Sequence, residues 1–102
     1  MIHVIATIEV HSGKRAEFLA EFHRLVPLVL AETGCIEYGP TVDVPTSLAV
    51  QGPVREDVVT VVERWADLAA LQDHLKAPHM GDYRERVKDL VRGVRLQVLQ
   101  PA

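Results

Sequence analysis

The chain has 102 residues, of which 48% are hydrophobic and 25% charged, so we expect one compact globular domain over residues 1–102. A net charge of −3, with the basic residues dispersed among acids, gives no reason to expect nucleic acid or an anionic membrane as a partner. No apolar run approaches the roughly 18 residues needed to cross a bilayer, and no basic segment leads into an apolar stretch at the start, so we expect a cytoplasmic protein.

The first two predicted elements are a strand and a helix. Residues 2–10, IHVIATIEV, alternate between apolar and more polar side chains, which is typical of a β-strand. From 14 to about 33, apolar residues recur at three- and four-residue steps, which indicates an amphipathic helix that ends at Gly34. Its apolar face consists of Phe18, Phe22, Leu25, Val26 and Val29. Because Pro27 lacks a backbone N–H, we expect a kink or a break in this helix.

Two more strands follow, separated by a long connection. Residues 35–44, CIEYGPTVDV, predict a second strand with Ile36, Tyr38, Val42 and Val44 in phase. The segment 45–57 is rich in turn-forming residues and predicts an irregular connection. Residues 58–65, VVTVVERW, predict the third strand.

The last third of the chain predicts two short helices and a strand. Asp67 is expected to cap a helix whose apolar stripe is Leu68, Leu71 and Leu75. Pro78 should start a second helix, ended by Gly93, in which these residues line up: Met80, Tyr83, Val87, Leu90 and Val91. A final strand has Val94, Leu96 and Val98 in phase. The order β-α-β-β-α-β, with its second helix broken, predicts a ferredoxin-like α+β fold with a four-stranded antiparallel sheet and helices on one face.

The third strand is apolar on both of its sides. Val59, Val61 and Trp65 point one way, and Val58 and Val62 point the other way. Helices can cover only one face of the sheet, so a second copy packed sheet against sheet would cover the other, and we expect a homodimer. The alternative is that these valines express strand propensity on a partly wet face.

Five short motifs occur in order along the chain. They are GK at 13–14 with Glu17 and Phe18, ETGCIEY at 32–38, ERW at 63–65, His74 nine residues after the Trp, and PHM at 78–80. Together they resemble the antibiotic-biosynthesis monooxygenase (ABM) domain, and in particular its quinol monooxygenase branch. The resemblance implies a dimeric α+β barrel with a pocket between sheet and helices in each subunit. It also implies oxidation of a small quinol or phenol by O₂ without metal, flavin or haem.

Such a reaction requires a base, an apolar pocket and a few hydrogen-bond donors. His74 is the candidate base, because an unperturbed imidazole has a pKa of about 6.5; the alternative is a boundary histidine that bonds a nearby carbonyl. Trp65 is a candidate catalytic residue that stacks on the substrate, or else a core residue. Tyr38 is either a phenolic donor to the substrate or a half-buried strand tyrosine.

The remaining candidates are predicted to bind the substrate. His79 and Arg86 fall on nearly the same side of the last helix, where a cation could stabilise a phenolate or a peroxide; the alternative is a solvated helix flank. Phe22 is expected in an apolar roof with Leu25 and Val26, and Val61 in the pocket wall. Cys35, the single cysteine, is expected to be a small buried apolar residue rather than a nucleophile. The histidines and the cysteine lack structural-zinc spacing.

The chain also departs from the family pattern. It contains no asparagine, whereas polyketide-oxidising members use one four residues before the Trp, where this chain has Val61. Haem-degrading relatives rely on an asparagine in the first strand, so both specialised activities are in doubt. The connection between Tyr38 and Trp65 looks longer than is usual in the family, and its extra segment, 46–57, could be a lid over the pocket or an arm across a dimer. The alternatives to a quinol monooxygenase are a haem-binding oxygenase and a non-catalytic ligand-binding barrel.

Overall fold

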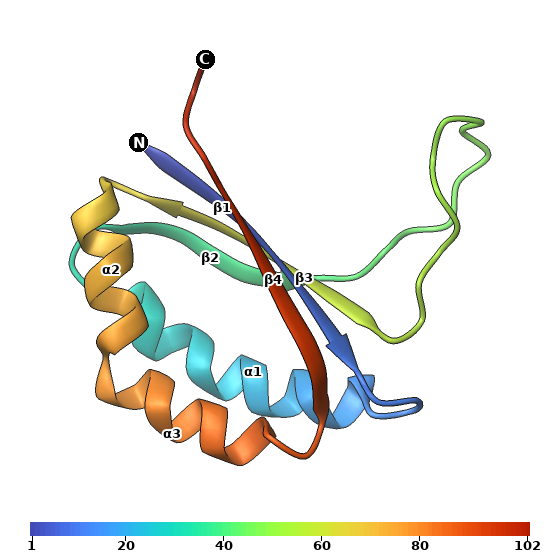
Figure 1. Cartoon of the computed structure of the whole chain (residues 1–102), viewed down its shortest axis with the longest axis horizontal. Helices are drawn as coiled ribbons and strands as arrows, with labels where there is room; N and C mark the ends of the chain where they lie inside the picture. The colour runs from blue at the N-terminus through green and yellow to red at the C-terminus, as the bar shows by residue number, and fades with distance from the viewer.

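Seven elements make up the chain, and the computed structural model describes all of residues 1–102. In order they are β1 (Ile2–Val10), α1 (Arg15–Leu30), β2 (Cys35–Thr41), β3 (Val58–Trp65), α2 (Leu68–Lys76), α3 (Pro78–Val87) and β4 (Val91–Leu99) (Figure 1). This is the predicted β-α-β-β-α-β order with the second helix divided in two, so the α+β prediction is confirmed. None of the helices has the length and apolar character that crossing a membrane requires.

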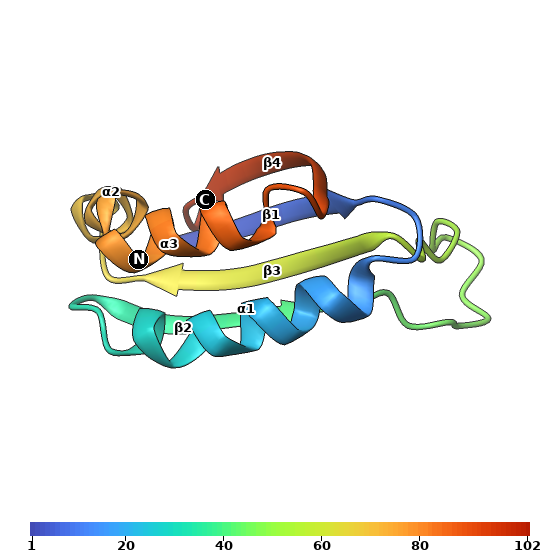
Figure 2. The ribbon, with the colours of Figure 1, turned by 90° about the horizontal axis from the view of Figure 1, so that it is seen from below.

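The four strands form one antiparallel sheet in the order β2-β3-β1-β4, with β1 paired to both β3 and β4. The three helices lie on one face of this sheet (Figure 2). Helix α1 runs along β2, whereas β4, at the other edge, has no helix over it. Val94 and Leu96 of β4 are register partners of Ile8 and Ala6, so they face the helix side and are nevertheless exposed.

The core lies between the helices and the sheet. Phe18, Phe22, Leu25 and Val29 of α1 are all buried, as the three- and four-residue spacing predicts. Burying one such side chain contributes about 1.5–3 kcal/mol of transfer free energy, so this face is enough to hold α1 on the sheet. The helix continues through Pro27 to Leu30, so the predicted break does not occur; a proline this close to the end of a helix removes one hydrogen bond from the last turns only.

One predicted element boundary and one predicted stripe are wrong. Gly93 does not end the last helix, because α3 stops at Val87 and Gly93 pairs with Glu9 inside β4. In α2 the buried residues are Leu71 and His74, whereas Leu68 and Leu75 are exposed. The helix is therefore rotated so that a histidine occupies its inner face. Asp67 caps the start of α2 as predicted, by accepting a hydrogen bond from the Ala70 N–H.

Strand β2 is shorter than its alternation predicts. It ends at Thr41, the last residue paired with β3, so Val42 and Val44 are exposed. A register shift between Cys35 and Glu37 leaves Ile36 exposed as well, while Tyr38 remains buried. Alternation of side chains thus predicts that a strand is present. It does not predict where the strand ends, because that depends on where its pairing with β3 stops.

Candidate active site

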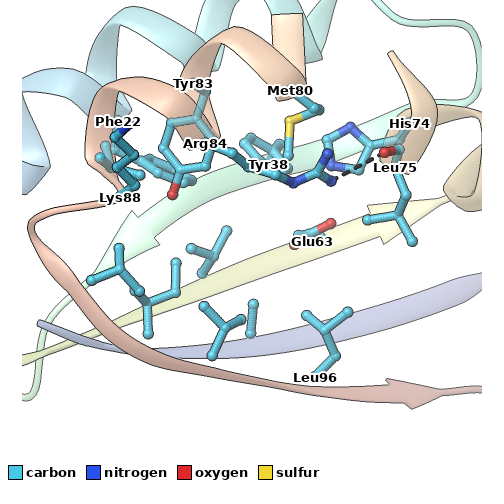
Figure 3. A pocket seen from close by; sticks show the side chains of 16 residues that line it. Phe22, Tyr38, Glu63, His74, Leu75, Met80, Tyr83, Arg84, Lys88 and Leu96 are labelled. Carbon is cyan, nitrogen blue, oxygen red and sulfur yellow. Dashed lines mark hydrogen bonds between the residues drawn. The ribbon is translucent and has the colours of Figure 1, made fainter. Parts of the chain in front are cut away.

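A cavity of about 410 Å³ lies between α3 and the helix-facing side of the sheet (Figure 3). Twelve of its sixteen lining residues are hydrophobic, and its volume falls within the usual range of small-molecule sites, about 300–1,000 Å³. The lining residues are Ala6, Ile8, Phe22, Tyr38, Val61, Glu63, His74, Leu75, Met80, Tyr83, Arg84, Val87, Lys88, Val91, Val94 and Leu96. The cavity exists because α3 leaves β4 uncovered, so the space between them is not filled by side chains.

Only two of the four apolar residues predicted for the pocket line the cavity. Phe22 and Val61 both line the cavity, as the family resemblance implies. Leu25 is fully buried in the core and Val26 is half-buried, and neither reaches the cavity. The ring of Phe22 stacks on Tyr38 at a centroid distance of 5.5 Å, which fixes the tyrosine against the roof.

His74 points inward from α2 and is only 2% exposed. Its Nδ1 lies 2.9 Å from Oε2 of Glu32, and because a carboxylate can only accept, Nδ1–H is the donor. The lone pair is then on Nε2, which has no partner in the protein and is not sealed in the core, and His74 is one of the residues that line the cavity. Burial lowers the pKa of His74, although the hydrogen bond to Glu32 opposes that effect. The imidazole is therefore neutral and basic at pH 7.

His79 does not line the cavity, in contrast to the prediction. Its Nε2 donates to the same Oε2 of Glu32 at 2.7 Å, and its side chain is 25% exposed. Glu32 thus receives two imidazole N–H groups, one from α2 and one from α3. The two hydrogen bonds fix the Glu32 carboxylate, which in turn orients His74. His79 therefore affects the cavity only indirectly, through Glu32.

Trp65 is fully buried and also does not line the cavity. Its ring packs against His74 at a centroid distance of 4.6 Å, and its indole N–H donates to Oε1 of Glu63 at 2.9 Å. The tryptophan therefore lies behind the cavity wall, where it holds two groups that do face the cavity. Stacking on a substrate, as predicted for this residue, is not possible from that position.

Glu63 is the acidic residue of the cavity, and the sequence analysis did not select it. It is 5% exposed, and its Cα partners are Tyr38 on β2 and Val4 on β1. Burial raises its pKa to about 7, against the opposing effect of the Trp65 N–H, and the charge of Glu32 raises it further. A signal was present in the sequence: within VVTVVERW, Glu63 has the same parity as Val59, Val61 and Trp65, which is the buried side.

Two tyrosines provide hydroxyl donors. Tyr38 of β2 lines the cavity as predicted, and Tyr83 of α3 joins it (Figure 3). Burial raises the pKa of both phenols, and for Tyr38 the nearby Glu63 carboxyl adds to the effect. Both hydroxyls therefore stay protonated and can donate hydrogen bonds to an oxygen of a bound molecule.

The cation at the cavity is Arg84 rather than Arg86. Arg86 forms an ion pair with Glu21 at 3.0 Å on the outside of α3 and α1. Arg84 lines the cavity, donates to the Leu75 carbonyl at 3.1 Å and forms no ion pair, and Lys88 lines the cavity one turn later (Figure 3). The seven-residue spacing from His79 correctly predicted that Arg86 lies on the same helix. It did not predict which side of α3 faces the cavity, and that side contains Arg84.

Neither Cys35 nor segment 46–57 contributes to the lining of the cavity. Burial, followed by the charges of Glu32 and Glu63, raises the pKa of Cys35, which agrees with a thiol that is not a nucleophile. No three His, Cys, Asp or Glu side chains are grouped so that they could hold a metal ion. Segment 46–57 extends beyond the end of the sheet and provides no cavity residue, so it is not a lid over this cavity (Figure 1).

Comparison with known proteins agrees with the fold along the whole chain. Residues 1–86 match the family model described as "Antibiotic biosynthesis monooxygenase". The protein named "Probable quinol monooxygenase YgiN" from Escherichia coli (strain K12) is 38% identical over 103 residues, covering 99% of this chain and 98% of that protein. The crystal structure of PA3566 from Pseudomonas aeruginosa has a TM-score of 0.80 and 26% identity, covering 99% and 93% of the two chains. Rv0793 from Mycobacterium tuberculosis has a TM-score of 0.79 and 26% identity, covering 99% and 94%.

Proposed function

This chain belongs to the antibiotic biosynthesis monooxygenase family, and on that premise we propose that it inserts one atom of O₂ into a small quinol or phenol bound in the cavity. The full-length similarity to a protein named as a quinol monooxygenase supports a quinol-type substrate. One observation carries the proposal: an apolar cavity contains a neutral imidazole whose Nδ1–H is held by Glu32 and whose Nε2 faces the bound molecule.

The proposed first step is removal of a hydroxyl proton from the substrate by Nε2 of His74. A quinol anion is a far better one-electron reductant than the neutral quinol, so it can reduce O₂ to superoxide and pass the spin barrier that protects closed-shell molecules. The semiquinone and superoxide then combine at a ring carbon to give a peroxide. The apolar walls protect the anion from water, which strengthens its interactions with nearby donors.

The overall reaction balances without an external reductant. A hydroquinone with a free ring C–H and one O₂ give a hydroxyquinone and one water. The ring loses four electrons and O₂ gains four, with one oxygen atom retained on the ring and the other leaving as water. The substrate is thus the only source of electrons, which is consistent with proton-transfer groups as the main reactive side chains of this cavity.

The lining also indicates which substrates fit. Phe22, Val61 and Met80 offer apolar surface to an aromatic ring, and the volume of about 410 Å³ suits one or two rings. Tyr38 and Tyr83 can donate to the ring oxygens, and Arg84 can stabilise the anionic form. We therefore propose a compact aromatic diol, with its oxygens directed at the polar end of the cavity that contains His74.

The proposal is tested by O₂ uptake with a hydroquinone substrate, measured on metal-depleted protein and corrected for autoxidation. His74→Gln should lower kcat by about 10²-fold or more, because it removes the base and keeps a side chain of similar size. His23→Gln is the matched control, since His23 is exposed on α1 and lies outside the cavity. Equal kcat values for wild type and His74→Gln would remove His74 from the mechanism.

We also propose that the chain is a homodimer that uses the face of the sheet opposite the helices. Val62 and Ile5 are register partners at the centre of this face and are half-buried in the single chain. They are surrounded by Thr7, Thr60 and Arg64, so the face is mixed rather than uniformly apolar. A small apolar centre with a polar border is the usual anatomy of a protein interface.

A further inference from the structure

The carboxyl group of Glu63 is buried, and no cation pairs with it to offset the cost of that burial. It is the only carboxyl group that lines the cavity, and it forms no ion pair with any cation. Its single hydrogen bond is with the indole N–H of Trp65, which Oε1 accepts. Burying a carboxyl group with one partner costs free energy that a leucine or valine at this position of β3 would avoid. A cost of this kind is a common mark of a functional group.

The second carboxyl oxygen is directed at the cavity. Oε2 of Glu63 has no partner in the protein and is not sealed in the core, and the small exposed part of Glu63 lies where the residue lines the cavity. Figure 3 shows Glu63 on the strand that forms the floor, below His74 and Arg84. Trp65 contacts both groups, through the hydrogen bond to Glu63 and the ring contact with His74, so their relative position is fixed.

We propose that Glu63 is a second catalytic residue, a general acid whose Oε2–H donates a proton to the distal oxygen of the peroxide formed on the substrate ring. This inference rests on the proposed function and assigns the later half of the reaction, after His74 has started it. It divides the proton transfers between two side chains on different elements, an imidazole on α2 and a carboxylic acid on β3.

The step balances in atoms and electrons. After His74 has returned its first proton to the peroxide, Nε2 takes the ring C–H proton, and that electron pair forms a C=O bond with the proximal oxygen. The O–O bond breaks, and the distal oxygen leaves as water with the proton from Glu63. The peroxide is reduced and the ring carbon is oxidised. His74 is then protonated and Glu63 is ionised, so one proton passing from His74 to Glu63 restores both groups.

The protonation state of Glu63 agrees with this role. Its pKa of about 7 means that a substantial fraction of the group is a carboxylic acid at neutral pH, whereas an ordinary glutamic acid would be almost fully ionised. Because an acid loses its proton as pH rises, the step should slow as pH rises through about 7. Because burial lowers the pKa of His74, the base is lost only as pH falls below the ordinary pKa of a histidine.

Several other titratable or charged groups line the cavity with Glu63 or lie near it. The elements β1 and β4 present only apolar side chains to this part of the cavity. The titratable or charged groups from the other elements are Glu32 after α1, Tyr38 of β2, His74 of α2, and Tyr83, Arg84 and Lys88 of α3. Burial lowers the pKa of His74 and raises that of Glu63, so the transition of His74 lies below that of Glu63.

The test compares Glu63→Gln with wild type in a hydroquinone assay that measures O₂ uptake, hydroxyquinone and H₂O₂ together. Glutamine can still accept from Trp65 but has no acidic proton. Hydroxyquinone formation should fall about 10²-fold, and a larger fraction of the consumed O₂ should appear as H₂O₂, because peroxide that is not cleaved escapes. The decline in kcat near pH 7 should disappear in the variant. Glu17→Gln is the matched control, since Glu17 is exposed on α1 and lies outside the cavity.

The outcomes are distinct. A Glu63→Gln variant with the wild-type rate, the wild-type ratio of hydroxyquinone to O₂ and the same pH profile would overturn the inference and leave the proposed function intact. A lower rate with an unchanged product ratio and an unchanged pH profile would show that Glu63 only supports Trp65, which also overturns it. If the wild-type protein consumes no O₂ with any hydroquinone, the proposed function fails and this inference fails with it.

Discussion

His74 and Glu63 are both buried, and burial has opposite effects on their pKa values. It lowers the pKa of the histidine and raises that of the glutamic acid, because the charged form is disfavoured in each case. Near pH 7 the cavity can therefore contain a neutral base and a neutral acid at the same time. Pairs of titratable groups whose pKa values are shifted in opposite directions by their environments are typical of acid–base sites.

The sequence predicted some of these residues and not others. His74 and Tyr38 were found through the motif ETGCIEY and the spacing from the Trp, and both line the cavity. Glu63 was not predicted, because a glutamate within VVTVVERW is normally expected to be exposed to solvent, although its parity places it on the buried side. Arg84 could not be separated from Arg86, because which flank of α3 faces the sheet depends on how the folded helix is tilted.

Gly34 is a residue whose substitution should destabilise the fold through two separate effects. Its φ is +85°, which disfavours any residue with a Cβ, and an added Cβ would lie 2.6 Å from Cβ of Ala70. Gly34→Ala should therefore lower the free energy of unfolding by about 2–4 kcal/mol, as measured by urea denaturation.

Gly13→Ala is the matched control for that measurement. Its φ of +75° is similar, but nothing lies within 4 Å of the added Cβ, so only the backbone cost of about 1 kcal/mol is expected. Equal losses in the two variants would show that the turn after α1 does not pack closely against α2. The result also concerns the site, since this turn carries Glu32 toward His74.

At the scale of elements, periodicity was sufficient to identify all seven helices and strands. Their ends were predicted less well, because they depend on pairing between strands that are distant in sequence. Strand β2 stops where β3 stops pairing with it, and β4 begins three residues early because Val91 pairs with Val10. The division into α2 and α3 was predictable, since Pro78 has the fixed φ that suits a helix start.

The outer face of the sheet leads to a prediction about assembly. Sedimentation velocity at micromolar concentration should show twice the mass of the 11.3 kDa chain. Val62→Glu should shift the protein toward monomer, because it places a charge at the centre of the proposed interface beside Ile5. Leu68→Glu, on the exposed side of α2, should leave the mass unchanged. A wild-type protein that sediments as a monomer would contradict the dimer.

For the whole molecule, the cavity is a consequence of how three helices cover four strands. Helices α1 and α3 fill the space over β2, β3 and β1 with aromatic and aliphatic side chains, and β4 remains without a helix. The sequence predicts the layers from element order, and the family resemblance implies a pocket. Neither predicts which polar groups meet there, because His74, Glu63 and Arg84 come from three elements whose relative positions arise only on folding.

The same arrangement accounts for the position of segment 46–57. Arg55 donates three hydrogen bonds to Asp43 at 2.9 Å, two from its guanidinium and one from its backbone N–H. They hold the base of this segment beyond the end of the sheet and lower the pKa of Asp43 to about 2. The cavity opens elsewhere on the molecule, along β4 and α3. Of the two roles predicted for the segment, only the arm across a dimer stays a prediction.

The most direct test of the central claim is to follow both atoms of ¹⁸O₂ during turnover of a hydroquinone by metal-depleted protein. If the cavity activates the quinol for direct reaction with O₂, mass spectrometry of promptly quenched samples should find one ¹⁸O atom in each hydroxyquinone and the other in water. Unlabelled quinone, with all of the label recovered as H₂O₂, would show a simple oxidase and contradict oxygen insertion in this cavity.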